Sequence, residues 1–497
     1  MIYPKFMKVL SLFALCFSLN TVDANNVQIS NVTYDEVANT LNFDLSWENG
    51  FRVSSSWSDH VYIFAKYKNS NGSSWESVLF ETSGHTDDSS TLLFTSAANS
   101  TPIDGKMLAV GGFHEASFTS GNQTANCTAQ LADNIDFINP SFKVFAIEMV
   151  KTTISNGDYY VGDGTSANRW HKGNDTTQAY FWEASSGPAT VGTGPNDINT
   201  THPDGIPVST MNSYIFNPPT NIMKYEITQQ QYVEFLNCLN RTAQNNRVSA
   251  DISGTTVTNV YVMTNTPNVG SFTRNGVRCD ATLPNGGPIT FYCDLNGNGV
   301  PNENDDGQNI AVNYISGEDL FAYLDWAGLR PLNEINYERI CRGSYNPVPN
   351  EFAWGTSGYE AAGINTNAPS AGTPEEVLSN APAMGPLRSS QQPMRVGAAA
   401  TATTNRVTSG ASAFGIMELS GNVAEIVIDL TSSSSYGGPT VGDGTLNLDG
   451  THDESWPSAV IEKGAFISGD AQTVSFRSEN TLPYGARSAF YGGRGGY

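Results

Sequence analysis

The chain has 497 residues, and its 48 acidic side chains outnumber 25 basic ones, which gives a formal net charge of -23 at pH 7. Only 15% of the residues are charged, against about 25% in an ordinary globular chain. The surface must therefore consist mainly of neutral polar residues. An acidic surface repels nucleic acid and anionic membranes and favours divalent cations, so we expect no nucleic-acid partner. At about 100 to 200 residues per domain, this length predicts two to four domains.

The N-terminus has the pattern of a secretory signal peptide. Lys5 and Lys8 precede an apolar run over residues 9–17, and small residues follow at 22–24. The run is shorter than the roughly 20 residues that a membrane-spanning helix needs, so we expect no membrane span. We therefore expect cleavage after residue 24 and a secreted protein, extracellular or on a bacterial cell surface. Lipidation at Cys16 is the alternative.

Five cysteines follow the signal peptide, and they match no dense disulfide framework and no zinc site. No Cys-x-x-Cys pair occurs among Cys127, Cys238, Cys279, Cys293 and Cys341. Cys279 and Cys293 bracket a loop rich in Gly, Pro and Asn, so we expect a disulfide there in an oxidising compartment. Closing a loop of that size would contribute ~3 kcal/mol. We expect the other three to be buried thiols.

Residues 25–141 show the alternation of short β-strands. Leu41, Phe43, Leu45 and Trp47 alternate with polar residues, and the segment 61–65 repeats the pattern. Turn-forming clusters separate these runs at regular spacing. The pattern predicts an all-β sandwich domain of roughly immunoglobulin size.

The remainder, 142–497, contains the signals of helix ends. Thr228 with Gln231 forms a capping box before an apolar helical face, and Ser316 with Asp319 repeats the device before a second one. Gly328 supplies a helix stop. Helices mixed with β patterns predict an α+β domain.

Five blocks in this region resemble, in order, the signatures of the formylglycine-generating, sulfatase-modifying-factor family. They are 223–228 with 235–237, 328–333, 341–343, 352–355 and 413–425. The resemblance implies a variant of the C-type-lectin fold, an α+β domain over 142–497 with insertions at about 163–205 and 245–310.

The sequence departs from the family where the chemistry resides. Family enzymes oxidise a substrate cysteine with a pair of their own cysteines, which also hold copper and follow a Gly-Gly-Ser-aromatic block. The matching region here is 463–470, and no cysteine occurs after Cys341. Copper(I) requires soft thiolate ligands, so we expect no copper and no catalytic residues, and hence a pseudoenzyme. An oxidoreductase of the family is the minority alternative.

The insertion contains a sequence typical of a calcium loop. Counted from Asp294, oxygen-bearing side chains fall at positions 1, 3, 5, 9 and 12, and Gly299 lies at position 6. The expected ligands are Asp294, Asn296, Asn298, Val300 through its carbonyl, Asn302 and Asp305. The alternative is a polar turn that needs no ion.

The family resemblance implies a second calcium site. In the family, a Gly-Asn-Val-x-Glu turn wraps a structural calcium ion. The match assigns Glu418 and Glu425 as carboxylate ligands and Gly421 and Val423 as carbonyl donors, which gives one or two calcium ions in all. Two merely solvated carboxylates are the alternative.

The C-terminal segment is rich in aromatic and arginine side chains, which interfaces favour. Tyr484, Phe490, Tyr491 and Tyr497 are a candidate interaction surface, although they could equally be core residues. We expect a non-catalytic extracellular structural protein that binds copies of itself in a surface layer or fibre. The alternative is a lectin-like adhesin that binds a surface glycan or protein.

Overall fold

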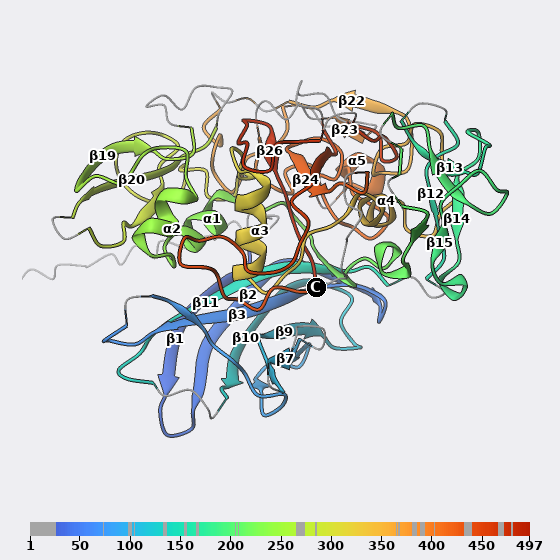
Figure 1. The fold of residues 1–497 in the computed structure, drawn as a ribbon. Coiled ribbons are helices and arrows are strands. Elements are labelled where there is room, and N and C mark those ends of the chain that lie inside the picture. The colour runs from blue at the N-terminus through green and yellow to red at the C-terminus, as the bar shows by residue number, and fades with distance from the viewer. Residues whose placement is uncertain are drawn as a thin grey trace, which may run out of the picture.

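The computed structural model is mostly β with few helices (Figure 1). It describes residues 26–497 except 73, 98–101, 104, 133–136, 154–156, 166–167, 204, 207, 265–273, 284–285, 364, 366–367, 380–384, 388–392, 402, 432–439, 466–471 and 479–480. The expected signal peptide and Cys16 lie outside the described residues. Within them, no helix combines the length and the apolar character that crossing a bilayer requires.

The N-terminal part is built on a ten-stranded sheet with the order β18–β11–β3–β2–β10–β5, to which β1, β4, β6 and β9 also pair. The strands are β1 Gln28–Asp35, β2 Thr40–Ser54, β3 Trp57–Lys68, β4 Glu76–Ser77, β5 Thr86–Asp87, β6 Leu92–Ser96, β9 Ala109–His114, β10 Ser120–Gln130, β11 Ser141–Lys151 and β18 Asn221–Met223. A separate hairpin joins β7 Pro102–Ile103 to β8 Lys106–Met107. The alternating residues 41, 43, 45 and 47 of β2 are buried, and they pack in one cluster with residues 61, 63 and 65 of β3.

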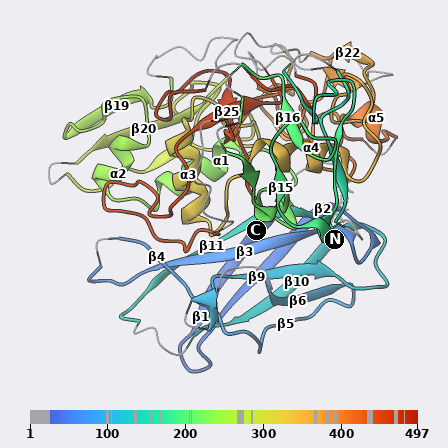
Figure 2. The same cartoon turned by 45° about the vertical axis from the view of Figure 1, so that its right-hand side comes forward.

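Strand β3 is buried on both of its faces. Because successive side chains of a strand point to opposite sides, Val61 and Ile63 enter the N-terminal core while Tyr62 and Phe64 enter the core shared with the rest of the chain. The Phe64 ring lies 5.0 Å from the Trp326 ring in an edge-on contact. Figure 2 shows this sheet directly beneath the helical part of the molecule.

The sheet continues past residue 141, where we expected the second domain to begin. Strand β11 pairs with β3 from Ser141 opposite Lys68 to Val150 opposite Asp59, and β18 then pairs with β11. The two parts of the chain are therefore joined by hydrogen-bonded strands and by a common core.

The C-terminal part carries five helices among its described residues: α1 Gln229–Leu236, α2 Arg241–Asn246, α3 Gly317–Trp326, α4 Glu334–Arg342 and α5 Arg406–Ser409. Both predicted capping boxes are confirmed, with Thr228 capping α1 and Ser316 capping α3. Gly328 follows α3 with a positive φ of 71°, as expected of a helix stop.

Short sheets surround these helices. They are β12 Tyr159–Val161 with β14 Tyr180–Trp182, β13 Trp170–Lys172 with β16 Ile198–Thr200, β15 Ala189–Thr190 with β17 Thr210–Met211, β19 Thr256–Tyr261 with β20 Val277–Thr282 and β21 Phe291–Cys293, β22 Tyr359–Ala361 with β23 Gly385–Leu387, and β24 Ala424–Ile428 with β25 Val460–Lys463 and β26 Tyr491–Gly492. Single-turn 3-10 helices lie at Ala184–Ser186 and Ser213–Phe216.

The disulfide expected between Cys279 and Cys293 is not formed, and all five described cysteines are free and buried. The register explains why, because Cys279 lies opposite Phe291 while Cys293 lies opposite Val277. The two residues are diagonal neighbours across the strand pair, and residues in such positions lie about 7 Å apart. A disulfide needs its Cβ atoms within about 4.5 Å.

Candidate metal centre

The calcium-type loop, residues 294–306, follows β21. This strand is the last of the three-stranded sheet β19–β20–β21, here called the insertion sheet. Asp294 continues the sheet through its N–H, which donates to the carbonyl of Gly276 at 2.9 Å. Two side-chain oxygens then shape the turn: Asn298 N donates to Asn296 Oδ1 at 2.9 Å, and Val300 N donates to Asn298 Oδ1 at 2.7 Å. Gly297 and Gly299 have φ values of 75° and 83°, a conformation that glycine adopts without strain.

Two carboxylates of this loop are fully buried, those of Asp294 and Asp306. Asp294 Oδ2 accepts from Gly299 N at 3.2 Å and pairs with Arg278, while Asp306 Oδ2 accepts from Glu303 N at 2.6 Å. The Oδ1 atom of each carboxylate has no hydrogen-bond partner. Burial raises the pKa of Asp306 to about 6, and the nearby charge of Asp294 adds to the rise.

The other predicted ligands of the loop are exposed. Asp305 is exposed, and its Oδ1 accepts from Asn296 Nδ2 at 2.9 Å. Asn302 is exposed as well, and its Oδ1 turns back to accept from Cys293 N at 3.1 Å. Val300 is half exposed. The motif places its last ligand at position 12, Asp305, whereas the buried carboxylate of this pair belongs to the next residue, Asp306.

The second predicted site contains an arginine. The carboxylate of Glu425 pairs with Arg494 through Nη2–Oε1 at 2.8 Å and Nε–Oε2 at 2.9 Å. Arg494 also donates to the carbonyls of residues 223, 224 and 417. The guanidinium of Arg494 thus neutralises a carboxylate that we had assigned to calcium.

The remaining residues of this turn form hydrogen bonds with other groups of the protein. Glu418 Oε1 accepts from Gly397 N at 2.8 Å, and burial raises the pKa of Glu418 to about 7. Gly421 N donates to the carbonyl of Gly464, and Val423 N donates to Glu226 at 3.1 Å. Glu226 and Arg494 belong to this buried charge cluster, although no sequence motif marks either of them as part of the site.

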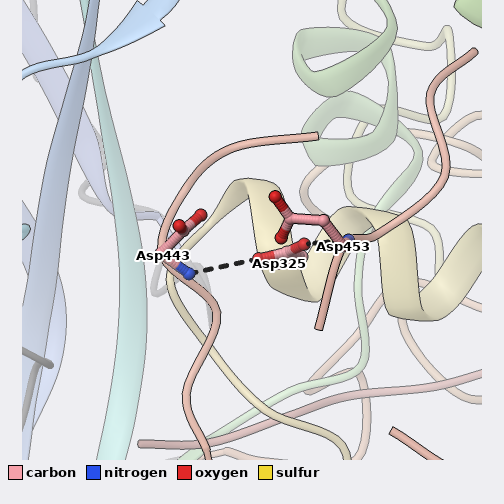
Figure 3. Close-up of side chains that lie close together, drawn as sticks. All are labelled: Asp325, Asp443 and Asp453. Carbon is pink, nitrogen blue, oxygen red and sulfur yellow. Dashed lines mark hydrogen bonds between the residues drawn. The ribbon is translucent and has the colours of Figure 1, made fainter. Parts of the chain in front are cut away.

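A third acidic group was not predicted at all. Asp325 at the end of α3 lies with Asp443 and Asp453 so that one oxygen of each falls within 4.8 Å of the others (Figure 3). Among the described residues it is the one group of three such side chains that could hold a metal ion. Both Asp325 oxygens already accept backbone N–H groups, from Asp443 and from Asp453, each at 3.1 Å. Burial raises the pKa of Asp325 to about 8, and the charges of Asp453 and Asp443 add to the rise.

The burial of the four aromatic residues near the C-terminus favours the core alternative over an interaction surface. Tyr491 and Tyr497 are 3% and 4% exposed, and Tyr484 and Phe490 pack partly buried against the same cluster. Tyr497 lies at the junction with the N-terminal sheet, where its hydroxyl is 2.8 Å from His60 Nε2. The C-terminal segment therefore fills the space between the sheet and the helices, where Figures 1 and 2 also place the C-terminus.

The described thiols are poor candidates for redox or metal chemistry. All five are buried, and burial raises the pKa of each. The thiolate is the form that binds metals and attacks substrates. These cysteines therefore serve as packing groups.

A cavity of about 500 Å³ lies near the acidic group. Its lining combines the aromatic rings of Trp75 and Trp326 with polar residues such as Asn240, Asp443 and Asn447. Aromatic faces with a few polar groups are typical of ligand pockets.

Comparison with protein-family models matches residues 183–494 to the sulfatase-modifying factor enzyme 1-like domain. Comparison with curated proteins gives no match. The match spans more than half of the chain and contains α1 to α5, the charge cluster around Arg494 and the loop of Asp294. The chain therefore belongs to the family of sulfatase-modifying factor enzyme 1-like domains.

Proposed function

We propose that this protein is a non-catalytic, secreted or cell-surface structural protein that uses a degenerate sulfatase-modifying-factor domain for assembly. In this proposal an immunoglobulin-like sandwich at the N-terminus and the C-type-lectin-like domain form one rigid unit. The observation that carries the proposal is the distribution of thiols. The last cysteine of the sequence is Cys341, in the middle of the matched domain rather than near its C-terminal end.

The donor set does not fit the copper ion of family enzymes. Cys341 is on α4, is fully buried, and has a pKa raised by burial. Copper(I) in these enzymes needs two thiolates, and the segment that would supply them contains none.

Two features support a role in assembly at a cell surface. The strong negative charge keeps single particles apart in the absence of divalent cations. The N-terminal sheet and the family domain share a core, so the unit is stiff enough to act as a building block. Calcium is the ion that we propose for contacts between or within such units, because its preferred ligands are oxygens.

A direct assay tests the absence of catalysis. The protein, supplied with copper, is incubated with a peptide that carries a family substrate cysteine, and the peptide mass is followed beside an active family member. We expect no oxidation of the cysteine. Turnover would refute the non-catalytic proposal.

Electron microscopy tests assembly. The chain from Asn25 onward is imaged in negative stain with calcium and again after chelation. Filaments or sheets that disperse on chelation are the expected result. Dispersed particles under both conditions would refute assembly.

Ligand binding is the second candidate function, and the cavity lined by Trp75 and Trp326 favours it. The lining brings tryptophan side chains together with amide and carboxylate groups, which can hydrogen-bond the hydroxyls of a sugar. Screening of a glycan array with the native chain and with Trp75→Ala tests this alternative. We expect a signal that the substitution removes if the cavity binds glycans.

A further inference from the structure

The loop between Asp294 and Asp306 contains an unbalanced charge. Two carboxylates there are fully buried, and only one oxygen of each has a hydrogen-bond partner. Buried polar atoms in folded proteins are nearly always paired, so two unpaired carboxylate oxygens in one loop require an explanation. The one cationic partner that the structure gives this pair is Arg278, which pairs with Asp294.

The other oxygens of the two carboxylates are held in place by the loop backbone. Gly299 N donates to Asp294 Oδ2, and Glu303 N donates to Asp306 Oδ2. Leu295 N also donates to the carbonyl of Asp306 at 3.3 Å, which brings the two ends of the loop together. The loop therefore fixes both carboxylates and leaves their Oδ1 atoms available.

We propose that this loop binds a calcium ion through Asp294 and Asp306, and that the ion competes with Arg278 for Asp294. Asn296, Asn298 and the carbonyl of Val300 complete the oxygen donors that the loop offers. Calcium takes six to eight oxygens in flexible geometry, whereas magnesium demands a tight octahedron, so calcium is the better match. This inference deepens the calcium part of the proposed function, on which it rests.

The last ligand of the proposed site, which closes the loop around the ion, is not the residue that the sequence motif predicts. Asp305, at position 12, is exposed and accepts a hydrogen bond from Asn296. Asp306, one position later, is buried with an unpaired oxygen. The structure therefore assigns the closing role to Asp306.

An ion at this position would close the loop of the insertion beside its contact with the rest of the family domain. The loop follows β21 of the insertion sheet, and Gly307 N donates to the carbonyl of Gly372 at 3.0 Å on the other side. Arg278 belongs to β20 of the same sheet, so its release from Asp294 would remove an ion pair that links β20 to the loop. Calcium binding would thus exchange a contact within the insertion for a contact that closes the loop.

Terbium luminescence tests the site in the full chain. Terbium replaces calcium at oxygen sites, and Tyr261 is placed to sensitise it, because its hydroxyl donates to the carbonyl of Asp294 at 3.1 Å. We expect emission on tyrosine excitation, removed by added calcium and much less sensitive to magnesium. Calorimetry with calcium then gives the affinity and the number of ions.

Three matched carboxylate-to-amide variants locate the ligands. Asp294→Asn and Asp306→Asn should weaken binding by at least about tenfold, because calcium affinity follows the number of charged ligands. Asp305→Asn is the control and should change binding by about twofold or less. Arg278→Gln should tighten binding, because it removes the competing cation.

Thermal unfolding shows whether the variants still fold. In chelator, Asp306→Asn should melt at the wild-type temperature or above, since it removes a buried charge, and calcium should no longer raise its melting temperature. Absence of calcium binding by the wild type would overturn the proposal, as would loss of binding in Asp305→Asn but not in Asp306→Asn. A lack of filaments with this binding intact would refute only assembly.

Discussion

Replacement of Lys224 by methionine should destabilise the protein at the junction between its two parts. The ammonium of Lys224 lies 2.9 Å from Asp59 Oδ2 of β3 and also pairs with Glu148 of β11. Burial alone would raise the pKa of Asp59, but the charge of Lys224 and the hydrogen bond from His114 hold it at about 2. Burial raises the pKa of Glu148 to about 8. Lys224 is therefore the cation that contacts both carboxylates of the cluster, while His114 contacts Asp59 alone.

The expected cost follows from the burial of the partners. Asp59 and Glu148 are 0% and 3% exposed, and removal of one partner of a buried ion pair costs about 3 to 5 kcal/mol because the other charge is left without compensation. Lys106→Met is the matched control. Its ion pair with Glu81 is partly exposed, with side chains 27% and 24% accessible, and pairs of this kind contribute about 0 to 1 kcal/mol.

Urea unfolding, followed by tryptophan fluorescence, measures both variants. The double variant Lys224→Met with Asp59→Asn should recover part of the loss, because the stranded charge is then removed. A free energy of unfolding for Lys224→Met within 1 kcal/mol of the Lys106→Met value would refute this account of the cluster.

Three further outcomes are expected. Gly328→Ala should lower the free energy of unfolding by about 2 kcal/mol or more, because φ is positive there and a Cβ would collide with Leu108 and lie 2.8 Å from the Tyr62 hydroxyl. Gly105→Ala is the control, because Gly105 has a similar φ and its Cβ would meet no atom within 4 Å. Equal losses of stability in urea unfolding would contradict the steric explanation. Without reductant, a maleimide should label none of the five described thiols in the native protein and all five after denaturation, whereas labelling of only three by mass spectrometry would reveal a disulfide. The free energy of unfolding should fall as pH rises from about 4 towards 8, in part because the folded state keeps a proton on Asp325, whose pKa is raised from 3.8 to about 8. In urea titrations at several pH values, Asp325→Asn should make this dependence on pH less steep. An unchanged dependence would show that Asp325 is ionised in the folded protein.

Local patterns in the sequence predicted local structure well. The capping boxes of Thr228 and Ser316 were correct because a cap depends on residues only three positions apart. The ordered family blocks were sufficient to identify the domain. The alternation in β2 identified its buried face, because burial of one side of a strand leaves a period of two in the sequence.

Features that depend on distant segments were not predictable in this way. Tyr497 is a core residue because β3, more than 400 positions earlier, supplies Tyr62 at a ring distance of 4.7 Å. Cys279 and Cys293 bracket a loop in sequence, but the strand register decides whether they meet. The role that we propose for Asp306 rests on its burial, which the position count of a calcium motif does not contain.

The double burial of β3 has a consequence for the evolution of this protein. Domains that are joined only by a linker can be exchanged by recombination, since each has its own hydrophobic core. Here Tyr62 and Phe64 line an interior that belongs equally to the family domain, in contact with Tyr497 and Trp326. Exchange of either part alone would leave this shared interior unfilled, so we expect the N-terminal sheet and the family domain to be retained together.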